Sequence, residues 1–379
     1  FAAPAAVAAG GACEAQASVA EGVAAGNGVV IAAVGVDQAA LVLAVRGQRL
    51  APVPDADWEA MIAKADVVLL GEHHNSLEDH GMELDVVRRL HRSAKAQGAP
   101  LSVGLEMVQQ RFQGALDRYV AGDIDEQELY RATDWSRRWS WPYEPYVQVF
   151  RFCRENGVRL VALNTDNESL GKVELGGLEA LQPEEWLQYI PDKDGFSKMG
   201  GDPEFKAYLG AVVMPSYTLH ARLGILQQTV SGQVLDQPMS LRNFVSGRLL
   251  WDETMAGAAV RAIQPPQGSA SGVPGKVCVL VGGDHVKYQY GVRARMERLA
   301  RLGAAVKDGA GAGRELNVLS VMLNPTPSDT LAPYGVQDLM LEMPIRQVAA
   351  AADGKPPQPP ISIPLADLIL MTRGTTSAA

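Results

Sequence analysis

Short apolar runs recur along this chain, and amphipathic segments separate them. The runs are long enough and rich enough in Val, Leu and Ile to predict buried strands. Four of them cover residues 65–70, 101–105, 158–163 and 276–281, and a fifth covers residues 316–323. Amphipathic helices are predicted over residues 55–65, 76–97, 109–121, 241–263 and 291–302. Strands that alternate with helices in this way predict an α/β fold with a central, largely parallel sheet flanked by helices.

The helix boundaries carry local signals. Asp55 is a plausible N-terminal cap for the first helix, whose Trp58, Met61 and Ile62 share one face. In the second helix the apolar residues recur at helical spacing, and Gly98 ends the pattern. These signals support the predicted order of elements.

The alternation of strands and helices stops after the third apolar run, residues 158–163. Residues 167–240 carry helical signals and many aromatic residues, but no convincing strand. We therefore expect a helical insertion over the C-terminal ends of the strands. The predicted organisation is an Ala/Gly-rich leader with N-terminal strands (1–50), an α/β domain (51–330) that contains this insertion, and a Pro-rich C-terminal extension (331–379). Residues 366–371 of the extension are apolar enough to dock on the domain.

The N-terminal region is dominated by Ala and Gly up to residue 28, which is typical of a leader. The residues before Cys13 lack a lipobox, so lipid anchoring is not expected. The apolar stretch 29–45 is interrupted by Asp37 and Gln38, and it is shorter than the roughly 20 residues of a membrane span. A pair of strands around a turn at residues 35–38 is the preferred interpretation, and no transmembrane span is expected.

Composition narrows the class of protein further. The 379 residues are 47% hydrophobic and 20% charged, which is typical of a globular chain with a large core. The formal net charge of −9 argues against binding to a phosphate backbone, so no nucleic acid partner is expected. The three cysteines lie far apart, which excludes a compact cysteine metal site, and Cys153 and Cys278 are expected in the core.

Polar side chains follow four of the predicted strands. Residues 65–70 lead to Glu72 and His74, residues 101–105 lead to Glu106, residues 158–163 lead to Asn164 and Asp166, and residues 276–281 lead to His285. Ligands of open α/β sheets bind beyond the carboxyl ends of the strands, so we expect one shared polar site. Strand alternation places Glu72 and His74 on the same side.

Two chemistries suit a site built from Glu72, His74, Glu106 and His285. Two imidazoles and two carboxylates can bind a divalent ion such as zinc, manganese or iron. The same groups without a metal can act as general acid and base. Among the remaining histidines, His73 is expected to cap the next segment or to face solvent. His80 and His91 are expected on the surface of their helix, and the alternative for His80, which faces the site end of that helix, is a part in the site.

Residues 135–146 form a dense aromatic stretch with three Trp and two Tyr residues. Core packing or a partner surface is the default interpretation of such a stretch, and a wall for a flat ligand is the more specific one.

Together these motifs resemble the ChaN-like haem-binding family. The matching segments are Val-Val-Leu-Leu-Gly-Glu-His-His-Asn (67–75), Gly-Leu-Glu-Met (104–107), Tyr-Glu-Pro (143–145), Leu-Asn (163–164), Trp-Asp-Glu-Thr-Met-Ala (251–256) and Gly-Gly-Asp-His (282–285). The resemblance covers roughly residues 55–302. The wider superfamily is similar to erythromycin esterases and TIKI/TraB proteases, whose paired Gly-x-x-His motifs are tied to hydrolysis and match His74 and His285 here.

The resemblance implies haem as a cofactor, bound in some members between two cofacial subunits. Tyrosinate or imidazole is a reasonable axial ligand. Candidate residues for haem are therefore Tyr143, Tyr146, His220 and His74, with Trp141 beside them. The Ala/Gly-rich leader and the C-terminal extension are more like a plastid member, with thylakoid association and a role in iron or tetrapyrrole handling, than a member of the bacterial periplasm or envelope.

Three hypotheses follow from the residues and the resemblance together. The first is a haem-binding or tetrapyrrole-binding protein, the second is a metal-dependent hydrolase, and the third is a non-catalytic subunit of a plastid complex. A homodimer fits the first and a hetero-complex the third. The sequence leaves the physiological ligand, the axial haem ligand, the metal and the oligomeric state open.

Overall fold

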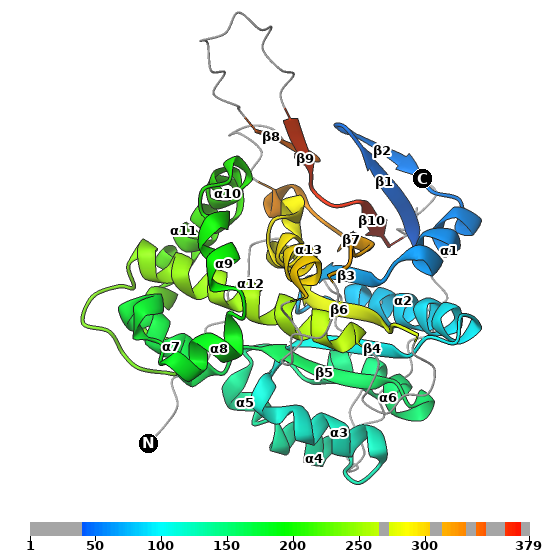
Figure 1. Ribbon diagram of the computed structural model, residues 1–379, viewed down its shortest axis with the longest axis horizontal. Coiled ribbons are helices and arrows are strands. Elements are labelled where there is room, and N and C mark those ends of the chain that lie inside the picture. Colours follow the sequence, from blue (N-terminus) through cyan, green and yellow to red (C-terminus); the bar gives the residue numbers. More distant parts are fainter. Residues whose placement is uncertain (1–39, 265–272, 304–312, 331–338, 346–360, 373–379) are drawn as a thin grey trace, which may run out of the picture.

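A mostly parallel sheet of eight strands forms the centre of the protein (Figure 1). The computed structural model describes residues 40–264, 273–303, 313–330, 339–345 and 361–372. In chain order the strands of this sheet are β1 (Leu41–Arg46), β2 (Arg49–Pro52), β3 (Val67–Glu72), β4 (Leu101–Gln109), β5 (Arg159–Asn164), β6 (Lys276–Gly282), β7 (Val318–Leu323) and β10 (Leu368–Met371). Their spatial order is β2-β1-β10-β7-β3-β6-β4-β5.

The five strands predicted from apolar runs occupy the middle and one side of the sheet. All the contacts among β3, β4, β5, β6 and β7 are parallel. Every residue of β3, β4, β6 and β7 is buried, because helices cover both faces of the sheet. Within this sheet, the described antiparallel pairs are those of β1 with β2 and with β10. The predicted α/β class is confirmed.

Helices cover both faces of the sheet, and each face has its own hydrophobic core (Figure 1). One layer contains α1 (Asp55–Lys64), α2 (Leu77–Ala96), α3 (Gln113–Ala121), α4 (Glu126–Ala132), α5 (Trp135–Arg138) and α6 (Val147–Asn156). The opposite layer is built mainly from α12 (Leu241–Ile263) and α13 (Val292–Leu302). The long amphipathic helix predicted over residues 241–263 has the same bounds in the structure.

Between β5 and α12 the chain forms the predicted insertion, which is helical. Its helices are α7 (Asn167–Gly176), α8 (Pro183–Tyr189), α9 (Lys193–Met199), α10 (Pro203–Tyr208) and α11 (Met214–Arg222). The insertion begins directly after the carboxyl end of β5 and lies at that end of the sheet (Figure 1). A smaller hydrophobic cluster joins α7, α8 and α9 to α12.

One of the local expectations, the cap of the first helix, is corrected. Asp55 is the first residue of α1 and does not cap it; Pro54 precedes the helix and its end has no side-chain cap. The turn expected at residues 35–38 lies outside the described residues, and β1 is already paired on both edges. The described part of the C-terminal extension includes β10 in the central sheet, in agreement with the expected docking of residues 366–371, and a small antiparallel sheet of β8 (Glu342–Ile345) and β9 (Ile361–Pro364).

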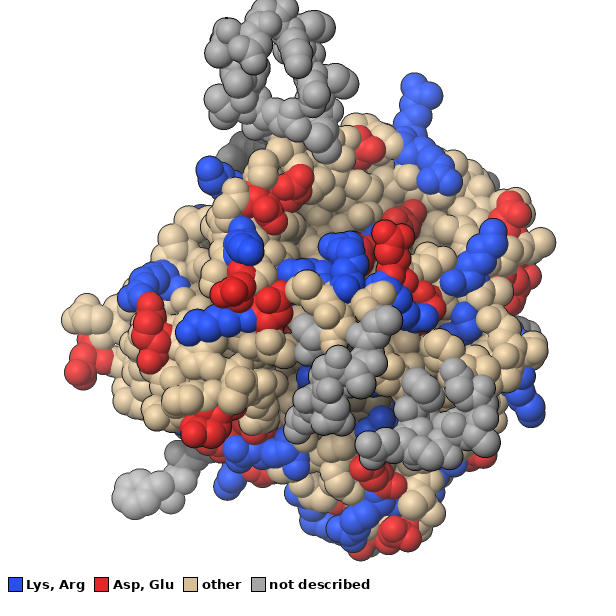
Figure 2. All heavy atoms as spheres, viewed as in Figure 1, with Lys and Arg blue, Asp and Glu red and all other residues tan. Residues whose placement is uncertain are grey.

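The predicted domain boundaries near residues 50 and 330 stay predictions. Strands from both flanking segments nevertheless belong to the same sheet as the predicted central domain. On the face shown in Figure 2, Lys and Arg side chains are interspersed with Asp and Glu side chains. None of the described helices combines the length and the apolarity that crossing a bilayer requires.

Candidate functional site

The first half of the site lies at the carboxyl end of β3. Glu72 is the last residue of the strand, and its Oε1 accepts hydrogen bonds from His74 Nδ1 at 2.6 Å and from the Tyr146 hydroxyl at 2.7 Å. Glu72 and Tyr146 are buried, whereas the His74 side chain keeps 18% of its surface exposed. The predicted pairing of Glu72 with His74 is therefore present in the structure.

The second half of the site lies at the carboxyl end of β6. His285 closes the short helical turn Gly283–His285 that follows the strand. Its Nδ1 lies 2.5 Å from Asp252 Oδ1, and its Nε2 lies 3.1 Å from Glu106 Oε1. All three side chains are buried. His285 is thus held between two carboxylates that come from α12 and β4.

Glu106 and Gly282 join the two halves. The other oxygen of Glu106, Oε2, accepts a hydrogen bond from the Gly282 backbone N–H at 2.6 Å. A Cβ atom at Gly282 would lie 2.8 Å from His74 Nε2, so the absence of a side chain there makes room for the imidazole. The structure therefore brings Glu72, His74, Glu106 and His285 to one rim of the sheet, as the strand ends predicted.

The charges at this rim stabilise one another. Burial alone would raise the pKa of Glu72, but the hydrogen bond from His74 and the charges of His74 and His80 contribute to lowering the pKa to about 2. Burial would lower the pKa of His74, yet the Glu72 hydrogen bond and the Glu106 charge raise it. His285 is likewise buried, and its pKa is raised by Glu106 and Asp252. Both imidazoles are therefore biased toward the charged form by neighbouring carboxylates.

Two tryptophans of the aromatic stretch border His74. The Trp139 ring meets the imidazole edge to face, with centroids 5.0 Å apart, and the Trp141 ring lies 5.7 Å away at a tilt of 36°. Trp251 borders His285 in a similar way, at 5.7 Å. The indole N–H groups of Trp139 and Trp251 are buried and have no hydrogen-bond partner among the described residues. The rim thus combines aromatic surface with two donors that lack acceptors.

The tyrosines proposed as haem ligands belong to the core. Tyr143 donates a hydrogen bond to the Glu126 carbonyl and packs against Trp135. Tyr146 donates to Glu72. Burial raises the pKa of both hydroxyls, and the Glu72 charge adds to this effect at Tyr146. Neither hydroxyl is set up to become a tyrosinate, because each is a buried donor.

His220 lies elsewhere, on α11 of the helical insertion. Its Nδ1 donates to the Ser216 carbonyl at 2.7 Å, and its ring packs against Phe244. No described contact joins His220 to the histidines of the rim. As a candidate haem ligand, His220 would therefore bind on the helical insertion and not beside the tryptophans that border His74.

Two residues next to the rim, Asp252 and His80, were missed or misplaced by the sequence patterns. Asp252 lies on α12 and holds His285, and the Tyr208 hydroxyl supports it from 3.0 Å. An acidic residue within an apolar helical face was the available signal. His80 was expected on the surface, but it is buried and its Nδ1 lies 2.9 Å from Glu83. The signal for this pair was a charged side chain three residues along on the same helical face.

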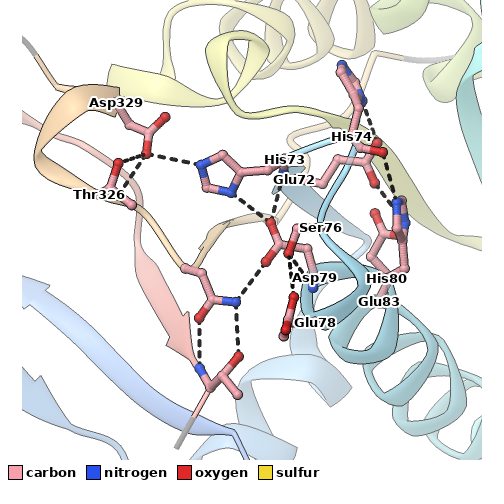
Figure 3. A network of polar contacts seen from close by, with 12 residues as sticks. Glu72, His73, His74, Ser76, Glu78, Asp79, His80, Glu83, Thr326 and Asp329 are labelled. Atoms are coloured by element: carbon pink, nitrogen blue, oxygen red, sulfur yellow. Dashed lines mark hydrogen bonds and ion pairs between the residues drawn. The ribbon is translucent and has the colours of Figure 1, made fainter. Parts of the chain in front are cut away.

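The metal set proposed from the sequence stays a prediction. Within the part of the chain that the structure describes, the acidic and imidazole side chains whose ligand atoms lie within 4.8 Å of one another are Glu72, His80 and Glu83. His73 has a different role, because its two ring nitrogens contact Asp79 at 2.8 Å and Asp329 at 3.0 Å (Figure 3). It neither caps a helix nor points freely into solvent.

The fold and the rim define an α/β protein with paired imidazole–carboxylate groups beyond the carboxyl ends of its strands. A sequence profile of the family described as haem-binding uptake, Tiki superfamily, ChaN matches residues 58–296. This match covers more than half of the chain, and the chain belongs to that family. The predicted resemblance is confirmed at the level of the family.

The chain is also similar to a chloroplastic protein and to a solved structure. It is 27% identical over 248 residues to Protein RETICULATA-RELATED 5, chloroplastic, of Arabidopsis thaliana; the match covers 64% of this chain and 30% of that protein. The structure is similar to ChaN of Campylobacter jejuni, which was solved with cofacial haem, with a TM-score of 0.53, 17% identity, and coverage of 88% and 97% of the two chains. At that identity the structural match establishes the fold.

Proposed function

We propose that this protein binds haem or a related tetrapyrrole at the rim of its sheet, with His74 as a ligand of the iron. One observation carries the proposal: His74 Nδ1 lies 2.6 Å from the Glu72 carboxylate, while Nε2 has no hydrogen bond to a described residue. Histidines that bind metals commonly donate their other ring N–H to a carboxylate, which fixes the orientation of the ring. Nε2 would then be the atom of His74 that binds the iron.

The surroundings of His74 fit a flat, largely apolar group with acidic substituents. Trp139 and Trp141 supply aromatic surface beside the imidazole. The unpaired indole N–H groups of Trp139 and Trp251 can donate to the carboxylates of a haem. When bound, haem supplies an iron centre that can bind small ligands or carry an electron. The chain holds the group, orients His74 through Glu72 and excludes water through its aromatic side chains.

A titration with haemin tests this proposal and distinguishes the two candidate imidazoles. The native protein is expected to shift the Soret band of haemin as it binds. His74→Ala is expected to weaken binding at least roughly tenfold, because the imidazole ligand is lost. His220→Ala is the matched control and is expected to bind like the native protein. An unshifted Soret band with the native chain would remove the proposal, and a loss confined to His220→Ala would move the ligand to the insertion.

We also propose that the protein acts in a plastid, where it would handle tetrapyrrole or iron. The support is the chloroplastic relative, of which this chain spans about a third. Cell fractionation with an antibody raised against this chain tests the location, and recovery of the protein outside the plastid fraction would contradict it. Thylakoid association, a homodimer and a plastid complex stay predictions.

A second candidate function is hydrolysis, which one observation favours. His285 lies between Asp252 and Glu106, so an imidazole able to donate a proton faces a carboxylate able to accept one. Turnover of chromogenic ester or peptide substrates, with and without added zinc or manganese, tests this candidate. Activity is expected to disappear in His285→Ala, and an inactive native protein would remove the candidate.

A further inference from the structure

Beneath the rim, three buried side chains converge from two elements. Glu72 ends β3, while His80 and Glu83 stand one turn apart on the same face of α2 (Figure 3). Exposure of the three residues is 3% or less. His80 Nδ1 lies 2.9 Å from Glu83 Oε2 and 3.3 Å from Glu72 Oε2. This group, Glu72, His80 and Glu83, is called the inner cluster.

The orientation of His80 is fixed by its other nitrogen. Nε2 lies 3.2 Å from the backbone carbonyl oxygen of His74. A carbonyl oxygen only accepts hydrogen bonds, so Nε2 carries a proton. In the neutral ring, Nδ1 then presents its lone pair to the two carboxylates. This is the arrangement by which a backbone carbonyl orients a histidine that binds a metal.

One oxygen of each carboxylate in the inner cluster lacks a hydrogen-bond partner. Glu72 Oε2 and Glu83 Oε1 are buried and have no hydrogen-bond partner within the described residues. Two buried carboxyl groups and an imidazole lone pair that face one another require a positive charge between them, either a proton or a cation.

We propose that the inner cluster binds a divalent transition-metal ion, through Glu72 Oε2, Glu83 and His80 Nδ1. All the candidate ligand atoms lie within 4.8 Å of one another. Ligands bound at about 2.0–2.2 Å and at right angles are roughly 3 Å apart, and the separations from His80 Nδ1 match this spacing. One imidazole and two carboxylates suit Mn²⁺, Fe²⁺ or Zn²⁺ better than Ca²⁺.

The inner cluster differs from the haem site and from the metal set expected at the rim. The inner cluster shares only Glu72 with those two sites. Glu72 turns one oxygen toward each side: Oε1 accepts from His74 and Tyr146, and Oε2 faces His80. The hydrogen bonds to Oε1 would orient the carboxylate toward the ion. Metal binding can therefore be measured without haem.

Cobalt is a suitable probe, because its visible absorption reports the ligands and the geometry of a protein site. The full chain is treated with a chelator, dialysed and titrated with Co²⁺, and the bound metal is measured by elemental analysis. We expect about one ion per chain and a rise in the temperature of unfolding, because the ion binds the folded protein. Glu83→Gln is expected to weaken binding at least roughly tenfold, since a neutral amide is a poor ligand.

Two controls make the test specific. In Glu83→Gln the side-chain amide N–H can donate to Glu72, so the metal-free variant is expected to fold. If that variant does not fold, Glu83→Asp is used in its place. Glu78→Gln removes an exposed acidic residue from the same helix and is expected to bind cobalt like the native chain. His74→Ala is expected to lose haem but to retain cobalt, because the carbonyl that orients His80 belongs to the backbone.

The outcomes separate the inner cluster from the rim. Stoichiometric cobalt that is lost in Glu83→Gln and kept in His74→Ala supports the proposal. No cobalt uptake by the native chain overturns it, and a proton then occupies the cluster. Cobalt that survives Glu83→Gln but is lost in His74→Ala also overturns it, since the ion then lies at the rim. Each result leaves the haemin titration as a separate measurement of the proposed function.

Discussion

Tyr146 connects the core of the protein to the rim through one hydroxyl group. Its ring packs against Trp135 and His80, and its O–H donates to Glu72 Oε1. The same oxygen receives the His74 N–H, so Tyr146 helps to fix the carboxylate that orients the exposed imidazole. A tyrosine that sequence comparison suggests as a haem ligand is therefore a positioning residue, and it works as a donor.

Replacing Tyr146 by Phe tests this role. A hydrogen bond to a charged group contributes about 1.5–3 kcal/mol, so the free energy of unfolding is expected to fall by that amount. Tyr143→Phe is the matched control: it removes a hydrogen bond to a neutral carbonyl, which contributes about 0.5–1.5 kcal/mol. Denaturant unfolding of both variants provides the measurement. Equal losses would show that Tyr146 has no special link to the Glu72 charge.

Between elements, His73 ties the start of α2 to a segment from the far end of the chain. Its ring nitrogens contact Asp79 on α2 and Asp329 in the short helical turn Pro327–Asp329 (Figure 3). Asn324 donates to the other oxygen of Asp79, and Lys287 lies 3.8 Å from Asp329. The hydrogen bond to Asp329 and that to Asp79 raise the pKa of His73 to about 10. An imidazolium therefore holds the two segments together.

The stability that His73 contributes is expected to depend on pH. Its pKa is higher in the folded protein than the ordinary value near 6.5, so its contribution is complete below about pH 6.5 and is lost as the pH rises toward about 10. The measurement is the difference in unfolding free energy between the native chain and His73→Gln, at several pH values. The difference should shrink through this window, and one that stays constant would exclude an ion pair at His73.

Across the whole molecule, the C-terminal segment completes the central sheet. β10 lies between β1 and β7, antiparallel to the first and parallel to the second. Leu368, Ile369 and Leu370 are buried there, on both faces of the sheet. Without β10, the N-terminal hairpin of β1 and β2 would lose its connection to the parallel strands.

Truncation tests this dependence. Removal of residues 361–379 deletes β9 and β10 and the burial of these three side chains, each of which contributes about 1.5–3 kcal/mol. The sum is comparable to the net stability of a typical domain, about 5–15 kcal/mol, so the truncated chain is expected to unfold or aggregate. Removal of residues 373–379 keeps β10 and is expected to leave the fold intact. Circular dichroism and resistance to protease distinguish the two, and a stable fold without β10 would contradict the expectation.

Much of the fold and part of the site follow from local patterns. The apolar runs at residues 65–70 and 276–281 became β3 and β6, and the helical periodicity of residues 241–263 became α12. Because parallel strands present their carboxyl ends at one edge, the meeting of His74 and His285 was also predictable. The partners that reach the same point from helices, Asp252 and His80, were not, because helical periodicity alone does not say what packs against each face.

By itself, the sequence determined the class of fold, the strand ends that carry the polar groups and the family to which the chain belongs, because each depends on patterns within a few residues. The tertiary structure decided which groups became partners. It made Tyr143 and Tyr146 buried hydrogen-bond donors, buried His80 beside two carboxylates and placed β10 between β1 and β7. Those outcomes depend on packing between segments up to hundreds of residues apart, which a local pattern does not encode.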